Sequence, residues 1–339
     1  MAATLGIALT NMGGPADLAG IEPFLFNLLA DPAMLGMPGW IRRPLAGLIA
    51  RRRAPRVVER YRLIGGGSPV VRGSEQQAAA VEQALGGRAL VRAVMRYTEP
   101  RAEVVLDAMR KAGVRRLIAL PAYPQYSCTT TGSSVDELRV AAAARGLELQ
   151  AGEAYATAPG YIDALAAGAV PWVNPGCHVL MTAHGLPERV IRAGDPYRDQ
   201  VQQTAEALAL RLPEGTPWSL AFQSRLGPVK WLTPYVEDEV ARLAAQGCQA
   251  LLTVPLTFAV ENLETLYDLD RVAAEQAGRL GIAWYHRAPA PGCHPRFIEA
   301  LAEVARSAAG RAGWSDLSSS ASAASRPGAA ASEEISHAG

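Results

Sequence analysis

Residues Val179–Pro187 read VLMTAHGLP, and this stretch decides the fold. An uncharged run of strand length ends at one imidazole, His184, after which Gly185 and Pro187 turn the chain away. Near-continuous apolar strands of this kind indicate a parallel sheet that is covered on both faces. In an open α/β sheet, the side chains at the carboxyl ends of the strands face the ligand crevice. His184 is therefore the first candidate for a functional residue.

Other short apolar runs alternate with amphipathic helical patterns along the whole chain. The expected strands are 4–10, 89–94, 115–121, 147–153, 177–183, 217–223, 249–255 and 282–286. The expected helices are 75–85, 101–112, 134–145, 160–169, 197–212, 234–246, 263–280 and 295–308. Two sets of four strands joined by helices predict an α/β fold with two doubly wound, Rossmann-like domains, each around a four-stranded parallel sheet.

Chain length supports two domains, because 339 residues suit two units of about 150 residues better than one core. Ala158-Pro159-Gly160 interrupts the pattern, so we expect an N-terminal domain over 1–157 and a C-terminal domain over 158–312. The last helix, 295–308, is able to pack back on the first domain. Residues 315–339 are rich in Ser, Ala and Gly and predict a disordered tail with no assigned role.

Composition excludes several classes of protein. The 33 basic and 32 acidic residues nearly balance, which argues against a nucleic-acid partner. The four cysteines are scattered without a CxxC pair and indicate reduced thiols. The first basic residue is Arg42, so we expect no secretory signal, and the uncharged stretch 164–187 is broken by Pro171 and Pro175. We therefore expect a cytoplasmic protein.

Segment 21–56 allows two interpretations. Hydrophobic residues at Phe24–Leu29 and Met34–Ile41 precede arginines at 42–43 and 51–53. One interpretation is a core helix followed by a solvated basic helix end. The other is an amphipathic lip that contacts a hydrophobic ligand or a membrane surface and uses its arginines for anionic groups.

Three loops carry unusual residues. Gly65-Gly66-Gly67-Ser68-Pro69 permits close backbone approach and offers a serine donor, although for this segment taken alone a simple tight loop is the favoured interpretation. Its spacing predicts no nucleotide cofactor. Met95-Arg96-Tyr97 follows a strand. Pro121–Ser134 (PAYPQYSCTTTGSS) also follows a strand, and Ser133 or Ser134 is the expected helix N-cap. Cys128 has no neighbouring base and is interpreted as structural.

Acidic residues follow the strand that ends near Pro255. We expect a helix from about Glu261, on which Glu261, Glu264 and Asp268 lie at i, i+3 and i+7 and share one face. Acids in a first helical turn also suit the helix dipole. Three acids on one face, beginning at a strand end, predict a path that attracts a divalent cation.

The run from Leu9 to about Ala308 resembles the ferrochelatases, which insert ferrous iron into a porphyrin in the last step of haem synthesis. The matching stretches, in the order of that family, are NMGGP, RRRAP…YRLIGGGSP, VMRYTEP, YPQYSCTTTGSS, TAHGLP…GDPY, FQSRLGPVKWL and ENLETLYDLD. The resemblance implies a tetrapyrrole cleft between the two domains.

The resemblance also implies roles for individual residues. His184 takes the pyrrole protons and contacts the metal, Glu264 binds the incoming iron opposite it, and Glu261 and Asp268 form the route for metal or protons. Implied porphyrin contacts are Met12, Arg52, Arg53, Ser68, Arg96, Tyr97, Tyr123 and Trp231. Met12 stands where ferrochelatases acting on coproporphyrin usually have tyrosine, so the implied substrate is protoporphyrin IX.

The chemistry agrees with these roles, because an imidazole is a suitable proton acceptor and a mixed N/O ligand set suits Fe²⁺ as a substrate. Two positions depart from some relatives: Asn262 replaces a histidine, and no cysteine follows Cys293, so we expect no [2Fe–2S] cluster. The alternatives are a coproporphyrin III ferrochelatase, a non-catalytic tetrapyrrole or metal carrier, and a relative that loads cobalt or nickel. The lip segment also suggests peripheral contact with the inner membrane.

Overall fold

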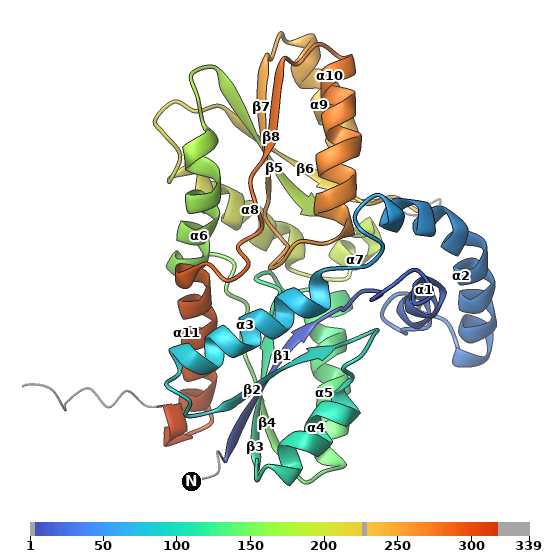
Figure 1. Cartoon of the computed structure of the whole chain (residues 1–339), viewed down its shortest axis with the longest axis vertical. Helices are drawn as coiled ribbons and strands as arrows, with labels where there is room; N and C mark the ends of the chain where they lie inside the picture. Colours follow the sequence, from blue (N-terminus) through green and yellow to red (C-terminus); the bar gives the residue numbers. More distant parts are fainter. Residues whose placement is uncertain (1–3, 226–228, 318–339) are drawn as a thin grey trace, which may run out of the picture.

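A computed structural model describes residues 4–225 and 229–317 of the chain, which form two parallel sheets (Figure 1). Sheet A has the strand order β2-β1-β3-β4, and sheet B has the order β6-β5-β7-β8. The strands of sheet A are β1 (Leu5–Asn11), β2 (Leu90–Met95), β3 (Arg116–Pro121) and β4 (Glu148–Ala151). Those of sheet B are β5 (Cys177–His184), β6 (Trp218–Gln223), β7 (Ala250–Pro255) and β8 (Trp284–Arg287). The predicted fold class is confirmed.

Helices cover both faces of each sheet, as its largely apolar central strands require. Sheet A lies between α4 and α5 on one face and α3 and α11 on the other, and sheet B lies between α9 and α10 on one face and α6 and α8 on the other. Their bounds are α3 (Val70–Ala84), α4 (Ala102–Lys111), α5 (Ser133–Ala143), α6 (Pro159–Ala169), α8 (Tyr197–Ala209), α9 (Val236–Ala245), α10 (Ala274–Arg279) and α11 (Pro295–Arg311). Two short helices lie in the second half of the chain: η2 (Val170–Trp172) precedes β5, and α7 (Glu188–Arg192) follows it.

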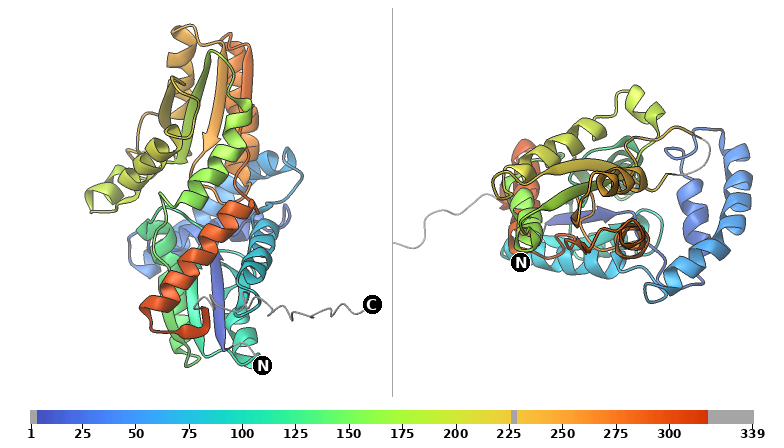
Figure 2. Two further views of the ribbon diagram at one scale, coloured as in Figure 1. Left: turned by 90° about the vertical axis from the view of Figure 1, so that its left-hand side faces the viewer. Right: turned by 90° about the horizontal axis from the view of Figure 1, so that it is seen from above.

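Side chains alternate between the two faces along each strand. In β1, Ile7 and Leu9 pack toward the cluster that includes α3 and α11, while Ala8 packs toward α4 and α5. The larger cluster extends through both halves of the chain, because α11 lies beside α6 and also contacts α3, β3 and β4 (Figure 2). The expected boundary between residues 157 and 158 falls in the connection between β4 and α6.

Two helices begin differently from the sequence prediction. Cys128–Gly132 forms a π-helix, η1, that runs directly into α5, and its N-cap is Ser127, whose Oγ accepts from the Thr129 N–H at 3.1 Å. Ser133 and Ser134 are therefore inside a helix, and their expected capping role is wrong. Residues Glu264–Ala273 form a second π-helix, η3, ahead of α10, so this helix does not begin at Glu261.

The lip, which we define as α1 (Ile21–Leu29), α2 (Gly39–Arg62) and the turn between them, projects from the side of the molecule (Figure 1). A small apolar cluster lies between the two helices while Arg51 and Arg52 are exposed, as the first interpretation of segment 21–56 predicts; contact with a ligand or membrane stays a prediction. Among the described helices, none is both long enough and apolar enough to cross a membrane.

The chain end is ordered slightly further than expected. Ser315–Leu317 forms a short 3₁₀ turn, η4, in which Leu317 is buried and Asp316 accepts from the Arg116 guanidinium at 3.0 Å. The tail expected from residue 315 is thus wrong for these three residues. The rest of that segment, 318–339, lies outside the described residues.

Candidate active site at the strand ends

His184 is the last residue of β5, and three hydrogen bonds fix its position. Its backbone N–H donates to Thr257 Oγ1 at 3.2 Å, and its carbonyl accepts from the Tyr197 hydroxyl at 2.8 Å. The ring atom Nδ1 lies 2.7 Å from the carbonyl oxygen of Gly185. A carbonyl oxygen only accepts, so Nδ1 carries the proton of the neutral ring and Nε2 keeps its lone pair.

Burial keeps this imidazole neutral. Desolvation lowers the pKa of His184 below its usual value, and it outweighs the Gly185 carbonyl and the charge of Asp268, which act in the opposite direction. The side chain nevertheless retains partial exposure. His184 is therefore an oriented, unprotonated base with Nε2 available.

Two carboxyl groups of η3 lie within electrostatic range of one another, and one of them, Asp268, also lies within range of this base. Burial raises the pKa of Glu264. Burial, followed by the charge of Glu264, raises the pKa of Asp268 to about 7, while Arg60 and His184 act to lower it. In a π-helix, N–H(i+5)→O(i) bonding places residues four and five apart on one face, which brings Glu264 and Asp268 together. The prediction that these two acids share a face thus holds through a different helix geometry.

Glu261 lies elsewhere. It precedes η3, and its Oε1 accepts from the Arg287 guanidinium at 3.0 Å and from the Ala290 N–H at 2.9 Å. The prediction that Glu261 lies on one helical face with Glu264 and Asp268 is wrong, because the chain is not yet helical at that point. Within residues 4–225 and 229–317, no three His, Cys, Asp or Glu side chains are close enough to hold a metal ion together.

The loop Gly13–Ala16, which follows Met12, packs against the glycine-rich loop Gly65–Pro69. Ser68 donates its backbone N–H to the Pro15 carbonyl at 2.7 Å, and a Cβ on Gly67 would lie 2.2 Å from the Ala16 carbonyl oxygen. A Cβ on Gly14 would meet Ser68 Oγ at 2.3 Å. The glycines therefore serve close backbone approach, and this places Ser68 beside the loop that carries Met12.

Met12 and Trp231 are held by backbone contacts. The Met12 N–H donates to Asn11 Oδ1 at 2.8 Å, and its carbonyl accepts from the Tyr97 N–H at 3.0 Å. Trp231 forms a β-bridge with Pro187, and its ring atom Cε3 lies 3.5 Å from the position that a Cβ on Gly185 would occupy. The indole is thus next to the strand end that bears His184.

The basic face of the lip meets the acidic π-helix. Arg60 lies 3.7 Å from Asp268 Oδ1, and its guanidinium lies over the Tyr267 ring at 5.3 Å from the centroid. Arg53 is half-buried, and its pKa is lowered first by burial and then by the neighbouring Arg60. Arg52, by contrast, is exposed. The half-buried Arg53 and its like-charged neighbour are suited to bind an anion.

The remaining predicted porphyrin contacts already have partners within the protein. The Arg96 guanidinium binds Asp31 at 2.8 Å and Glu137 at 2.9 Å, and the Tyr97 hydroxyl donates to Asp31 at 2.9 Å. Tyr123 is partly buried, and burial raises its pKa. The structure therefore places Arg96 and Tyr97 in a polar network under the lip.

Sequence reasoning missed several residues that support the site. Asp195 of the GDPY motif accepts from Ser127 Oγ at 3.0 Å and the Cys128 N–H at 2.7 Å, and Tyr197 of the same motif holds the His184 carbonyl. Tyr61, before the glycine loop, is buried, with its pKa raised by burial and by Glu264. The sequence signal that could have found these residues is the presence of tyrosine and aspartate in segments that otherwise have the composition of loops.

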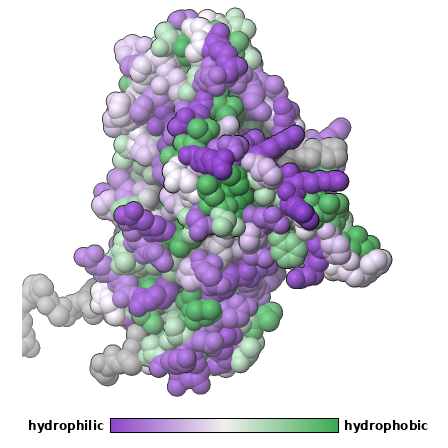
Figure 3. Space-filling model, turned by 45° about the vertical axis from the view of Figure 1, so that its right-hand side comes forward, coloured by the Kyte–Doolittle hydropathy of each residue, from purple (hydrophilic) through white to green (hydrophobic). Residues whose placement is uncertain are grey.

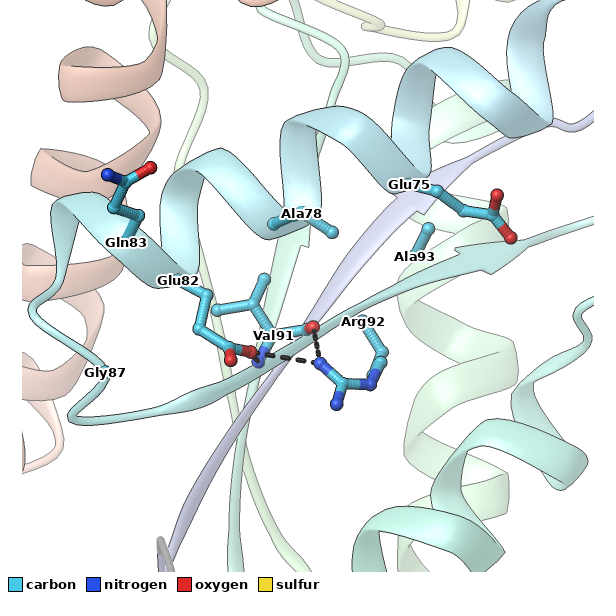
Figure 4. A pocket seen from close by; sticks show the side chains of 9 residues that line it. Glu75, Ala78, Glu82, Gln83, Gly87, Val91, Arg92 and Ala93 are labelled. Carbon is cyan, nitrogen blue, oxygen red and sulfur yellow. Dashed lines mark hydrogen bonds and ion pairs between the residues drawn. The ribbon is translucent and has the colours of Figure 1, made fainter.

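A separate cavity lies away from these residues. It measures about 340 Å³ and runs along α3 and the outer edge of β2, where Glu82 accepts from the Val91 N–H and from Arg92 (Figure 4). The residues that line it are Glu75, Ala78, Ala79, Glu82, Gln83, Gly87, Val91, Arg92 and Ala93, none of which is a predicted site residue.

Comparison with known proteins gives a consistent picture. The family model described as Ferrochelatase matches residues 4–309. A ferrochelatase of Phenylobacterium zucineum is 42% identical over 319 residues, covering 91% of this chain and 92% of that one. A ferrochelatase of Caulobacter vibrioides is 39% identical over 322 residues, covering 92% of each.

Solved structures share the fold. The chain resembles SirB from Bacillus subtilis with Fe³⁺, with a TM-score of 0.53 at 16% identity over 71% of this chain and 92% of that chain. A second match is the sirohydrochlorin chelatase SirB from Bacillus subtilis subspecies spizizenii in complex with cobalt, with a TM-score of 0.50 at 14% identity over 70% of this chain and 90% of that chain. At these identities the likeness shows the two-sheet architecture alone.

Proposed function

The chain belongs to the ferrochelatase family, and on that premise we propose that it inserts Fe²⁺ into protoporphyrin IX, with His184 as the base. Metal insertion into a porphyrin, a step of haem biosynthesis, is the activity of the family. The observation that carries the assignment of the base is the Nδ1 contact with the Gly185 carbonyl, because it leaves Nε2 unprotonated on a fixed ring.

The reaction replaces two pyrrole N–H protons with one Fe²⁺ ion bound to four nitrogens. We assign His184 Nε2 as the acceptor of a pyrrole proton, and its lowered pKa keeps it in the accepting form near neutral pH. Because the ring cannot turn without breaking its bond to Gly185, the lone pair stays aimed at one place. Nε2 accepts the second pyrrole proton after it has released the first to solvent, to which the side chain is partly exposed.

We assign Glu264 as the iron ligand opposite the base and Asp268 as the next carboxylate along the route. Both lie on one face of η3, and Asp268 lies within electrostatic range of His184 and of Glu264. A nitrogen and oxygen donor set binds Fe²⁺ weakly enough to release it to the four porphyrin nitrogens. Glu261 is left out of this route, because Arg287 and the Ala290 N–H already occupy its Oε1.

The porphyrin contacts follow from the surfaces around this base. We assign Arg53, supported by Arg52, to the propionates, since its cation is half-buried next to Arg60. Ser68 and Tyr123 border the same region in our proposal. Met12 and Trp231 would press on the ring, and bending it exposes the N–H groups that a planar ring hides.

The choice of protoporphyrin IX rests on Met12. An apolar, unbranched side chain at this position fits a hydrophobic edge of the macrocycle. Coproporphyrin III, which carries four carboxylates, is the alternative substrate. A metallation assay under anaerobic conditions with each porphyrin, followed by loss of porphyrin fluorescence, decides between them, and faster turnover of coproporphyrin III would contradict the assignment.

The second candidate function is a tetrapyrrole carrier without activity. The same assay separates it, because a carrier binds porphyrin without metallating it. The oriented lone pair of His184 near the carboxyl group of Asp268 favours the enzyme, since binding alone requires no base.

We also propose a cytoplasmic protein whose lip touches the membrane surface. Trp40 is 79% exposed and Leu48 is 49% exposed, with Arg51 and Arg52 also exposed on the same helix. Figure 3, which brings the lip side forward, shows hydrophobic and hydrophilic side chains interleaved there. Co-sedimentation with anionic vesicles that is lost in Trp40→Ser would support this contact, and equal sedimentation of the variant would contradict it.

A further inference from the structure

The lip has its own small hydrophobic cluster, separate from the cores of the two sheets. Ile21, Leu25, Ala50, Ala54 and Tyr61 are buried against one another. Among the described residues, Leu263 is the partner that packs on this cluster from beyond residues 18–64. Burial of apolar surface therefore holds α1 and α2 together but contributes little to their attachment to sheet A.

One buried carboxylate makes three of the polar contacts between the lip and the elements around sheet A. Asp31 lies in the turn between α1 and α2 and is 5% exposed. Its Oδ2 accepts from the Tyr97 hydroxyl at 2.9 Å, from Ser133 Oγ at 2.5 Å and from the Arg96 guanidinium at 2.8 Å. The donors come from the loop after β2 and from the first residue of α5, so this network joins the lip to a strand end of sheet A and to a helix that covers it.

The other groups in the network strengthen the attachment. Oδ1 of Asp31 accepts from the Ala33 N–H at 2.8 Å, which shapes the turn itself. Arg96 also donates to Ser133 Oγ at 2.9 Å and pairs with Glu137. Asn27 of α1 donates to the Tyr97 carbonyl at 2.9 Å. Charge-assisted bonds among buried groups are the stronger class of hydrogen bond.

Apolar packing is incomplete at this junction. A cavity of about 180 Å³ lies there, lined by Phe26, Asn27, Ala30, Asp31, Pro32, Arg43, Arg96, Tyr97 and Arg101. Close packing therefore does not fix the height of α1 above the strand ends. Removing one partner from a buried charged network leaves the others unpaired, so this position depends on the carboxylate.

We propose that Asp31 is a positioning residue that holds the lip over the cleft, and that Arg96 and Tyr97 act through it rather than on the propionates of the substrate. The proposal rests on the proposed function in that the lip borders the bound porphyrin. It reassigns two residues that the resemblance placed among the porphyrin contacts, because the Arg96 guanidinium already faces two carboxylates.

The kinetic test uses two porphyrins that differ only in their carboxylates. Asp31→Asn and Arg96→Gln should each raise the KM for protoporphyrin about tenfold, with kcat and the KM for Fe²⁺ within about twofold of wild type. The rise should be equal for protoporphyrin dimethyl ester, and the double variant should be no worse than either single one. A penalty for Arg96→Gln that disappears with the ester would overturn the proposal, as would an unchanged KM in Asp31→Asn.

A second readout does not depend on activity. In Asp31→Asn, the amides of α1 and α2 should exchange with solvent at least about tenfold faster, while those of β1 keep their wild-type rates. Asp136→Asn is the matched control, since Asp136 is an exposed carboxylate of α5 that pairs with the exposed Arg139. If Asp31→Asn does not fold, Tyr97→Phe removes one donor and should show the same local effect.

The two readouts separate failure of this proposal from failure of the proposed function. If the wild-type protein metallates no porphyrin, the proposed function is contradicted, while the exchange experiment still tests the positioning role of Asp31. If the wild-type protein is active but the α1 and α2 amides of Asp31→Asn and Tyr97→Phe exchange at wild-type rates, only the positioning role of Asp31 is overturned.

Discussion

Arg60 on the lip and Asp268 on the π-helix lie 3.7 Å apart and connect the two sides of the candidate site. The pair is partly exposed, with side-chain exposures of 49% and 26%, so its own energy is small. The pair matters because Arg60 acts to lower the pKa of Asp268. Burial and the charge of Glu264 act in the opposite direction, and the pKa is raised to about 7.

Because the pKa of Asp268 is raised, we expect this carboxyl group to lower the free energy of unfolding as the pH rises, which is opposite to the usual effect of a carboxyl group. The usual pKa of this carboxyl is 3.8, so the folded protein holds the proton more tightly than the unfolded chain does. The stabilisation is present at low pH and is lost as the pH rises from about 4 toward 7. Asp268→Asn should therefore unfold in urea with a stability at pH 8 that is roughly 1–4 kcal/mol higher than wild type, because one pKa unit is worth about 1.4 kcal/mol. Equal stabilities at pH 8 would contradict this account.

Close approach of the glycine loops predicts a large effect of a single methyl group. Gly67→Ala should lower the free energy of unfolding by roughly 2–4 kcal/mol, because the new Cβ would lie 2.2 Å from a backbone carbonyl. Gly278→Ala is the matched control, because Gly278 lies in α10 and the added Cβ would have no neighbouring atom within 4 Å apart from its own helix backbone. This substitution should raise the free energy of unfolding by roughly 0.5–1 kcal/mol. Chemical denaturation measures both, and equal effects would refute the packing argument.

Support of the His184 backbone predicts a kinetic role for Tyr197. Tyr197→Phe leaves the His184 carbonyl without its donor, so kcat should fall about tenfold through a displaced ring. Tyr155→Phe is the control, because the Tyr155 hydroxyl is equally buried but donates to the Pro121 and Ala122 carbonyls. Similar kcat losses in both variants would show that the effect is general and not positional.

The different surroundings of the acids predict different sensitivities to iron. Glu264→Gln should raise the KM for Fe²⁺ more than about tenfold, whereas Glu261→Gln should change it less than about twofold, because Glu261 pairs with Arg287. Steady-state metallation at varied Fe²⁺ measures both values. A large effect of Glu261→Gln would return this residue to the metal route.

The sequence predicted the strands well and the helix geometry poorly, for physical reasons. Apolar runs such as 249–255 identify buried strands because both faces of each sheet are covered, and their ends therefore located His184 correctly. The start of the helix at Leu263 and its π geometry leave no local pattern, so Glu261 was predicted to lie on a helix that has not yet begun there. Asp31 was missed because a lone aspartate in a turn is ordinary, and its partners Tyr97 and Ser133 are distant in sequence.

The central claim is that His184 Nε2 removes the pyrrole protons. Stopped-flow loss of porphyrin fluorescence in the presence of Fe²⁺ tests it most directly, with His184→Ala compared with wild type over pH 5–9. The account predicts that His184→Ala binds protoporphyrin but metallates it at least about 100-fold more slowly, in line with loss of a general base. It also predicts that the acidic limb of the wild-type profile, which falls below the usual pKa of histidine because burial lowers it, disappears in the variant. Metallation by His184→Ala at the wild-type rate, with the same pH profile, would contradict the claim.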